Sequence, residues 1–505
     1  MARTYDDYTR DKIGWFFGLR GWQLGVLAVT ATPVFLALQR TAWSSAATFA
    51  GLWVLVLVVT AMPVRGRSAT GWLLAATATA VGGTARWSVW RSPASRGHAH
   101  DLAVADLPGV LHGIQVHDGP PRGAAMSRTA IIQHHAQRTW AVTAQVTHPG
   151  IGMAGATERD RYGAGLSQLL DVAARTGLVD ELLIMVRTVP DDGAERDLWL
   201  ARQQRAGAPV VSRQVNDDLR QALTGAAVRT ETFVTVVVPE ARIGRPAREA
   251  GGGLDGRARV LYGVLAEVEQ QLRGPLAMTA VTWLTSPQLA LACRTGFAPG
   301  DRAGLVEAMA RRDHHPDQDP GVNADVPWAM AGPSGADTAA RQYSHDAWNS
   351  VSATLQLPAN GAVLGSLAPV LTPTEAGERR SYAAVFPIMT AGRADRATAN
   401  AEWAADLGEE LRTRAKVRPR ARTRAETGRA RTVDAKLALG AALVRPYAVC
   451  TVTVPKTMRV AEFGRRLDAA VRAAGFAPLR LDLSQDVGFA CSTVPLGVDL
   501  ARGGR

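Results

Sequence analysis

Two uncharged apolar runs near the N-terminus constrain the fold of this chain more than any other feature. GWQLGVLAVTATPVFLAL spans residues 21–38, and AATFAGLWVLVLVVTAMPV spans residues 46–64. Each run approaches the ~20 residues that an α-helix needs to cross a ~30 Å hydrocarbon core. Only the short segment QRTAWSS separates them. We therefore expect a two-helix transmembrane hairpin, in which a neighbouring helix satisfies the carbonyl freed by Pro33.

The charges that flank the runs predict how the hairpin is oriented. Arg40 is the only basic residue between the two runs, whereas several basic residues lie outside them: Arg10, Lys12, Arg20, Arg65 and Arg67. The positive-inside rule then places both termini and the bulk of the chain in the cytoplasm, as a multi-pass protein of the cell membrane. A cleaved signal peptide is disfavoured, because the preceding segment is long and mixed in charge and a second run follows at once.

A third apolar stretch, GWLLAATATAVGGT at residues 71–84, is short and rich in threonine and glycine. We expect it to form a helix that lies along the inner membrane surface. The alternative is a third crossing, which would invert the orientation of everything downstream. Residues 1–95 thus form the predicted membrane part. The tryptophans expected at the membrane interface are Trp15, Trp22, Trp43, Trp72 and Trp87.

From about residue 100 the chain alternates predicted strands and helices, which indicates an α/β (α+β) class with ferredoxin-like split β-α-β halves. The first half spans residues 100–310, a loop rich in proline, aspartate and glycine spans 311–340, and the second half spans 341–505. Strands are expected within 129–148 and at 181–190, 232–239, 276–284, 349–358, 381–390 and 448–455. Helices are expected at 156–177, in the segment up to 225, and at 255–272, 394–443 and 460–474. No precise sequence repeat relates the two halves.

Several motifs suggest chemistry without supporting it. GIGMAG, residues 150–155, matches a dinucleotide-binding pattern, but the preceding strand alternates like a half-exposed hairpin strand, so we expect a flexible loop. His314 and His315 lie among aspartates in a loop without a fixed scaffold, and His134 and His135 lie at a hairpin turn. We expect both pairs to be solvated. We predict no catalytic residue, no metal site and no cofactor.

The three cysteines, Cys293, Cys450 and Cys491, are far apart, form no CxxC pair and lie in apolar contexts. We expect all three to be buried and reduced, as is usual for a cytoplasmic protein.

The chain is strongly basic, with a net charge of +12, and much of that charge lies in residues 412–431. This expected helix carries nine basic residues against Glu426 alone: Arg412, Arg414, Lys416, Arg418, Arg420, Arg422, Arg424, Arg429 and Arg431. Three interpretations remain open: a solvated connector, a contact with an acidic protein or anionic lipid surface, and a contact with nucleic acid. No aromatic residues interleave with the arginines to stack on bases.

Several segments together resemble parts of conjugative transfer systems. GWFFGLRGWQLG, the hairpin and MPVRGRSATGWLL resemble small PrgI-like membrane proteins. RTWAVTAQV, LLIMVRTVPDDG, HDAWNSVSATLQLP, YAVCTVTVP and FACSTVPLGVDL resemble the amino-terminal domain of VirB-type conjugation ATPases. In those ATPases a strand ending in a Leu-Pro-Leu-Gly-like motif closes this domain and a P-loop motor follows. The resemblance therefore implies a terminal strand here. Because the sequence contains no Gly-Lys dipeptide, the GxxxxGK[ST] motif is absent from it.

The resemblance is to an actinobacterial family of conjugation-associated membrane proteins, and it implies a non-catalytic docking component. Its partners would be a separately encoded secretion ATPase, other membrane components of a type IV-like apparatus, and the anionic lipid surface, within a multi-subunit complex. One alternative is an EccE-like membrane component of a type VII secretion system. A membrane-tethered DNA-binding adaptor is the other.

Overall fold

The computed structural model describes residues 4–5, 21–61, 63–64, 67–84, 88–98, 101–123, 126–152, 154–191, 193–203, 205, 207–226, 228–315, 317, 325–358, 361–375, 377–390, 392–396, 428 and 432–500. The chain divides into two compact units. Thr9–Ser88 forms one, and Met1–Tyr8 together with Val89–Arg505 forms the other.

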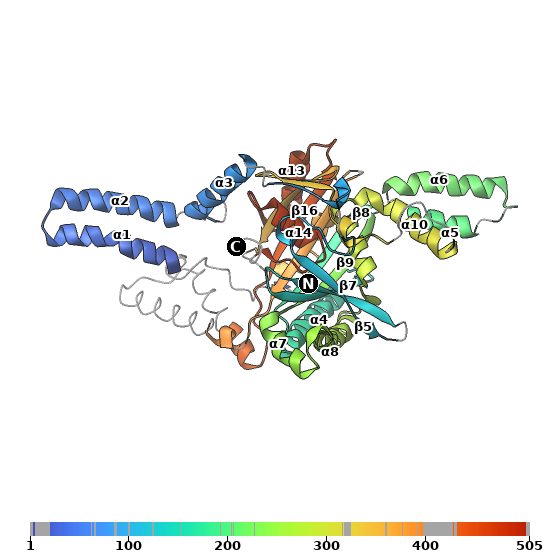
Figure 1. The fold of residues 1–505 in the computed structure, drawn as a ribbon, viewed down its shortest axis with the longest axis horizontal. Helices are drawn as coiled ribbons and strands as arrows, with labels where there is room; N and C mark the ends of the chain where they lie inside the picture. Colours follow the sequence, from blue (N-terminus) through green and yellow to red (C-terminus); the bar gives the residue numbers. More distant parts are fainter. Residues whose placement is uncertain are drawn as a thin grey trace. The chain divides into compact units, whose positions relative to one another are not determined.

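The smaller unit contains the apolar runs. Its elements are α1 (Gly21–Gln39), α2 (Trp43–Ala61), the two-residue strands β2 (Pro63–Val64) and β3 (Arg67–Ser68), and α3 (Ala69–Thr84). Helices α1 and α2 lie side by side (Figure 1), and the indole N–H of Trp53 donates to the carbonyl of Leu27 at 2.9 Å. Pro33 lies within α1 without ending it, as predicted.

One helix in the described part of the chain is long and apolar enough to cross a membrane. It is α2, whose window Trp43–Thr60 has a mean hydropathy of 1.7. The apolar part of α1, Gly25–Gln39, is shorter, and α3 has 16 residues. Length and composition therefore support a single crossing helix among these residues, fewer than the two that the sequence predicts.

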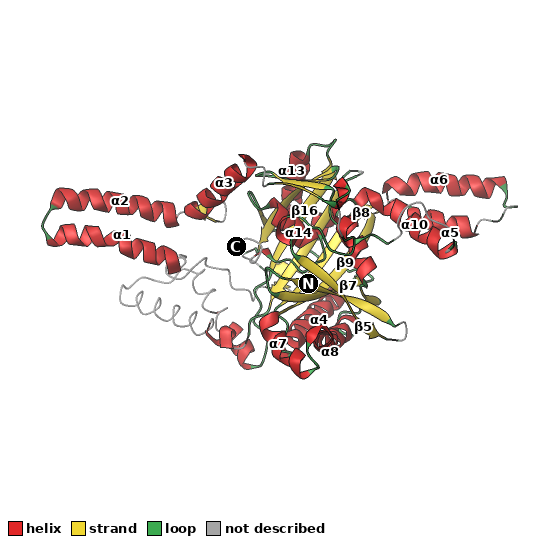
Figure 2. Ribbon diagram, in the orientation of Figure 1, coloured by secondary structure: helices red, strands yellow, loops and turns green. Residues whose placement is uncertain are grey.

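Thirteen of the described strands of the larger unit form one sheet, and their pairings are antiparallel. Its strands are β4 (Val89–Arg91), β5 (Ile114–Arg122), β6 (Ser127–His134), β7 (Thr139–Thr147), β8 (Glu181–Pro190), β9 (Val228–Pro239), β10 (Ala280–Trp283), β11 (Gly335–Thr338), β12 (Tyr343–His345), β13 (Trp348–Gln356), β15 (Arg379–Pro387), β16 (Tyr447–Pro455) and β17 (Ala477–Arg480). Separately, β1 (Thr4–Tyr5) pairs with β14 (Ala362–Val363). The strands dominate the centre of Figure 2. The large antiparallel sheet agrees with the predicted mixed fold class.

The sheet contains the same strand order twice. In the first part β10, β7, β9 and β8 are neighbours in that order, and β7 also pairs with the hairpin β5–β6. In the second part β17, β13, β16 and β15 are neighbours in that order, and β13 also pairs with the hairpin β11–β12. A helix follows the last strand of each part, α9 (Ser286–Phe297) after β10 and α14 (Gln485–Thr493) after β17. The second part therefore repeats the topology of the first.

Short sequence matches accompany the repeated topology. TVVVP ends β9 at residues 235–239 and TVTVP ends β16 at 451–455, while ACRT in α9 (292–295) matches ACST in α14 (490–493). The hydroxyl groups of Thr143 and Thr235 are 2.9 Å apart between β7 and β9. Those of Ser352 and Thr451, in the equivalent strands, are 2.6 Å apart. These matches show that the repeat extends to buried side chains.

Strands β8 and β15 join the two parts edge to edge. Thr235 pairs with Leu183, and its equivalent Thr451 pairs with Ser381, so Leu183 and Ser381 are equivalent positions. Two residues further along the same strands, Met185 is therefore equivalent to Ala383. Met185 and Ala383 also pair with each other. The register is therefore that of a local two-fold axis passing through this pair.

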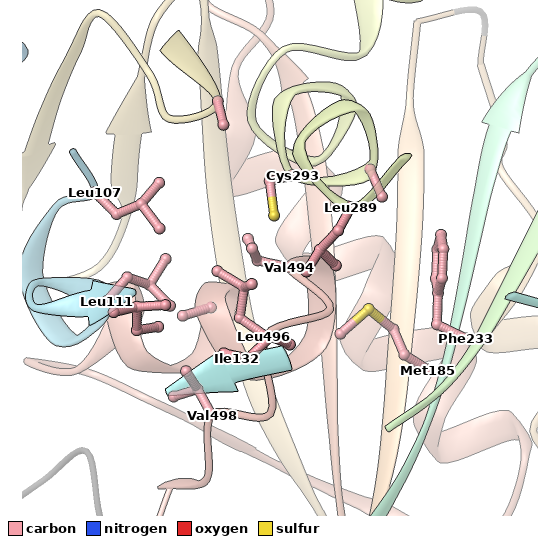
Figure 3. Packing of buried hydrophobic residues seen from close by; sticks show 14 of the residues in the cluster. Leu107, Leu111, Ile132, Met185, Phe233, Leu289, Cys293, Val494, Leu496 and Val498 are labelled. Carbon is pink, nitrogen blue, oxygen red and sulfur yellow. The ribbon is translucent and has the colours of Figure 1, made fainter. Parts of the chain in front are cut away.

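Helices cover both faces of the sheet. On one face α9 and α14 share a single core with strands of both parts, and Figure 3 shows Leu289, Cys293, Met185 and Val494 meeting there. The helices α4 (Ala156–Arg175), α7 (Glu240–Glu249) and α8 (Gly253–Arg273) enclose a second core with the first part. Helix α13 (Val460–Ala473) encloses a third core with the second part. The face that carries α9 and α14 thus makes the two parts one folding unit.

Several predicted elements are confirmed and others are not. The strand at 181–190 and the helices at 156–177, 255–272 and 460–474 agree with β8, α4, α8 and α13 within a few residues. The predicted linker 311–340 contains the buried Trp328 and the whole of β11, so part of it is packed. The prediction of a terminal strand is wrong, because α14 occupies that segment and each of its residues is buried. Most of the helix expected at 394–443 lies outside the described residues.

Candidate docking surface on α5 and α6

Two helices interrupt the first part of the sheet. Helices α5 (Ala194–Gln203) and α6 (Val210–Ala226) lie between β8 and β9, and α10 (Arg302–His314) contacts α5. All three lie beyond the sheet at the right of Figure 1. By the repeated topology, the equivalent connection is the one between β15 and β16, and it carries the basic stretch 412–431. The two long connections of the repeat thus carry the two features most suited to contact another molecule.

Ion pairs attach α5 and α6 to the rest of the unit. Glu195, in the first turn of α5, pairs with Arg302 of α10 at 2.8 Å and also with Arg229 of β9. Asp197 of α5 pairs with Arg220 of α6 at 2.8 Å. Both carboxylates lie at the N-terminal end of α5, where the helix dipole favours negative charge. Ion pairs at their base therefore help to position the two helices.

A buried ion pair lies beneath this base. Arg187 of β8 donates through Nε and Nη2 to one oxygen of Glu231 of β9, at 3.1 and 2.6 Å. Its remaining nitrogen, Nη1, donates to the carbonyls of Ala292 at 2.8 Å and Thr493 at 3.0 Å. Burial alone would raise the pKa of Glu231, but the neighbouring arginines, Arg187 first among them, bring that pKa below its usual value. The pair thus ties the strands that flank the insertion to both α9 and α14.

Helix α6 presents an apolar stripe to solvent. Val211, Val215 and Leu219 follow one another at intervals of four residues, so they share one face of the helix. Their exposed fractions are 70%, 49% and 49%. Trp199 of α5 is also 59% exposed. Because an amphipathic helix normally buries its apolar face, this exposed stripe is a candidate docking surface.

The residues that the sequence nominated for partner or membrane contact are described only in part. Arg412, Arg414, Lys416, Arg418, Arg420, Arg422, Arg424, Arg429 and Arg431 lie outside the described residues. Trp15, Trp87 and the side chain of Trp22 lie outside them as well. Trp43 is 73% exposed at the start of α2, and Trp72 is half-buried in α3. The exposure of Trp43 is compatible with an interfacial position.

The other nominated motifs have simpler explanations. His135 is exposed as predicted, but the prediction for His134 is wrong, because it is buried and its ring nitrogens face the Val110 carbonyl and the Gln137 N–H. The three cysteines are free and buried, as predicted. Burial raises the pKa of the Cys293 and Cys450 thiols to about 12. No cluster of metal-binding side chains occurs among the residues that the structure describes.

Sequence reasoning missed the apolar stripe of α6, although a signal for it was present. The four-residue spacing of Val211, Val215 and Leu219 is readable in VVSRQVNDDLRQAL. What the sequence could not show is that this face stays exposed after folding. No protein-family model matches this chain, and no curated protein matches it.

Proposed function

We propose that this protein is a non-catalytic, membrane-anchored docking component of a type IV-like secretion apparatus for conjugative DNA transfer. It would hold a separately encoded ATPase at the inner face of the membrane, within a complex that includes other membrane components. The observation that carries this proposal is the apolar stripe of α6, exposed on a helix pair held at its base by ion pairs. Such a stripe suits an apolar helix or groove on a partner.

The membrane part of the proposal is a two-span hairpin with both ends in the cytoplasm. The contact between Trp53 of α2 and the Leu27 carbonyl of α1 supports it, because it joins the two apolar helices along their length. The hydropathy of α2 supports it as well. Basic residues outside the runs favour a cytoplasmic location for the larger unit and for its contact with anionic lipid.

We further propose that both parts of the sheet are ferredoxin-like. In each, the strands taken in chain order lie side by side as fourth, first, third and second, which is the strand order of a split β-α-β arrangement. The first part also has both of its helical connections, with α4 between the first two strands and α8 between the last two, whereas in the second part the corresponding described helix is α13, between the last two strands. In this arrangement the connection between the second and third strands is the one that carries α5 and α6 in one part and residues 412–431 in the other. An apolar contact and a basic contact would thus be displayed from equivalent points of the repeat.

Co-purification with the VirB-type ATPase encoded nearest to this chain tests the proposal. The two proteins would be co-expressed, extracted in a mild non-ionic detergent and separated by size-exclusion chromatography. The variant V211S/V215S/L219S removes the apolar stripe, and Q214S/D217S/Q221S changes the same number of exposed positions elsewhere on α6. We expect stoichiometric co-elution for wild type and the control, and at least about a tenfold loss for the stripe variant.

Equal co-elution of all three proteins would remove α6 from the docking surface. No co-elution of wild type, with folding verified by circular dichroism, would contradict the conjugation proposal. Co-elution instead with a multi-ATPase-domain protein of the EccC type would favour the type VII alternative. Tight, salt-sensitive DNA binding without any ATPase would favour the DNA adaptor.

A further inference from the structure

A pocket lies on the larger unit, away from α5 and α6. Its accessible volume is 560 Å³, and its lining comes from β5, the turn between β6 and β7, and the first turns of α7 and α8. The side chains that define it are those of His117, His135, Arg138, Trp140, Glu240 and Arg257. Gln133, Gly253 and Leu254 complete the lining, so the charged groups in it are two arginines and one carboxylate.

The carboxylate and one of the arginines neutralise each other. Arg257 donates through Nε and Nη2 to the two oxygens of Glu240, at 3.2 and 2.5 Å. The indole N–H of Trp140 also donates to Glu240, and the Arg257 guanidinium lies 5.2 Å from the centre of the Trp140 ring. These contacts, the Arg257 hydrogen bond first, lower the pKa of Glu240, so it stays ionised and fully engaged. Glu240 therefore forms part of the floor and places no unpaired negative charge in the pocket.

The remaining polar groups favour an anion. Arg138 is exposed at the end of the turn, and its positive charge acts on Glu240, which places it at the same cavity. His117 contacts the Gln133 side chain at 2.8 Å and His135 contacts that of Gln115 at 3.0 Å, so each ring is held in place by an amide. Both ring nitrogens of His135 are engaged, because Nδ1 also contacts the Gln133 amide nitrogen at 3.5 Å, whereas Nδ1 of His117 can face the pocket. The balance of charge in the lining is therefore positive.

The backbone at the edge of the pocket adds to the same preference. Gly251, Gly252 and Gly253 have φ angles of +112°, +72° and +61°, and Gly253 begins α8. Gly252, the N-cap, provides no side-chain hydrogen bond to the first turn. Asp255 lies in that turn but is exposed and is not part of the lining. The start of a long helix thus faces the cavity with its backbone N–H groups uncapped by a side chain.

The repeat shows that the backbone at this turn does not require the charged lining. The backbone N–H of Glu240 donates to the Arg138 carbonyl at 2.9 Å, and that of Lys456 donates to the Ala347 carbonyl at 2.8 Å in the equivalent turn. The equivalent position thus holds a lysine in place of the glutamate, and an alanine in place of the arginine. The same backbone contact forms with different side chains, so the turn itself does not require Arg138 or Glu240.

We propose that this pocket binds a phosphate group, with Arg138 and the first turn of α8 as its donors and the His117 ring beside it. The phosphate can belong to a soluble phosphate ester or to a lipid headgroup, because the pocket is open at the surface and recognises the group itself. The Arg257–Glu240 pair on the Trp140 ring forms a rigid floor that orients it. Guanidinium donors make short, charge-assisted hydrogen bonds to phosphate oxygens.

Isothermal titration calorimetry on the full chain in non-ionic detergent and phosphate-free buffer tests the proposal. The two probes are pyrophosphate and short-chain dihexanoyl phosphatidic acid, used below its critical micelle concentration. We expect one of them to bind at a single site, R138A to bind about tenfold more weakly, and R138E to show no detectable binding. R175A, which removes an exposed arginine at the end of α4, is the matched control and should bind as wild type does.

Each outcome decides one point. Arg138-dependent binding of pyrophosphate alone assigns a soluble phosphate ester, and Arg138-dependent binding of the lipid alone assigns a headgroup. Binding of both confirms the phosphate site, and the probe that binds more tightly then indicates the source of the phosphate. Absence of binding by wild type, or an equal effect of R138A and R175A, would overturn the proposal. Because Arg138 is exposed, its variants should unfold at the wild-type temperature, which circular dichroism checks.

Discussion

Two glycines of α8 allow the packing of this helix to be tested, because replacement by alanine should have opposite effects at the two positions. A Cβ built on Gly256 would lie 2.2 Å from the Ala247 carbonyl oxygen of α7, whereas one built on Gly263 has nothing within 4 Å. Neither glycine has a positive φ. Gly256→Ala therefore forces two helix backbones apart, and Gly263→Ala only improves helix propensity.

The magnitudes follow from these distances. Overpacking that moves α7 away by roughly 1 Å should lower the free energy of unfolding by an amount near the upper limit of about 1–3 kcal/mol. Replacing a helical glycine by alanine raises it by about 1 kcal/mol. We expect Gly256→Ala to lower the free energy of unfolding by about 2 kcal/mol and Gly263→Ala to raise it by about 1 kcal/mol. Urea unfolding of the full chain in detergent, followed by tryptophan fluorescence, measures both. If Gly256→Ala is as stable as wild type, the close approach of α7 and α8 is refuted.

Three further perturbations test the interior. Arg187→Met leaves Glu231 buried without its main partner, so we expect a loss of about 3–5 kcal/mol in the free energy of unfolding at pH 7, measured in urea. Because the pKa of Glu231 is lowered, the stability from this pair is present above the unfolded-state pKa and is lost as pH falls through the folded-state pKa. The free energy of unfolding of the variant should therefore not show this decrease at acidic pH. Burial raises the pKa of Asp486, so the free energy of unfolding falls as pH rises from the ordinary pKa of this carboxyl to its raised pKa. Asp486→Asn should therefore unfold at a higher urea concentration than wild type at pH 7, and the difference should disappear near pH 3. The three cysteines should resist maleimide until urea unfolds the chain, and rapid labelling of the native protein, read by mass spectrometry, would contradict their burial.

Local patterns in the sequence predicted most individual elements of the larger unit, and the failures have identifiable causes. Strand β8 is a buried apolar run that ends in a Pro-Asp-Asp-Gly turn, so its ends are encoded locally. Helix α14 has no polar face, because all its residues from Gln485 to Thr493 are buried. A helix that is enclosed on every side loses the 3.6-residue periodicity from which helices are recognised. The wrong prediction of a strand came from the resemblance of FACSTVPLGVDL to a segment that ends in a strand, and no local periodicity corrected it.

The repeat and the pocket could not be predicted, because both depend on contacts between distant segments. The matching stretches, TVVVP with TVTVP and ACRT with ACST, are too short to distinguish from chance without the strand order. In the pocket, Arg138 and Arg257 are more than a hundred residues apart in sequence and are brought together by β7, β9 and α8. The run of glycines at 251–253 is readable in the sequence, but the side chains that lie near it in the pocket are not.

The exchange of arginines between the two parts explains why the repeat forms one unit. Helix α9 belongs to the first part, and the carbonyl of Thr295 in its last turn accepts a hydrogen bond at 2.8 Å from Arg379 of β15, in the second part. Helix α14 belongs to the second part, and its equivalent carbonyl, that of Thr493, accepts one from Arg187 of β8, in the first part. Carbonyls at the C-terminal end of a helix lack partners within the helix and attract cations.

Each part therefore supplies the cation that caps the last helix of the other. Burial, and then the charge of Arg187, lower the pKa of Arg379 to about 9, so it remains a cation at neutral pH. Separating the parts would leave two buried guanidinium groups and two helix ends without these partners, in addition to exposing the paired edges of β8 and β15. The connection that carries α5 and α6 consequently begins and ends in a sheet that both parts form, because β8 and β9 belong to it.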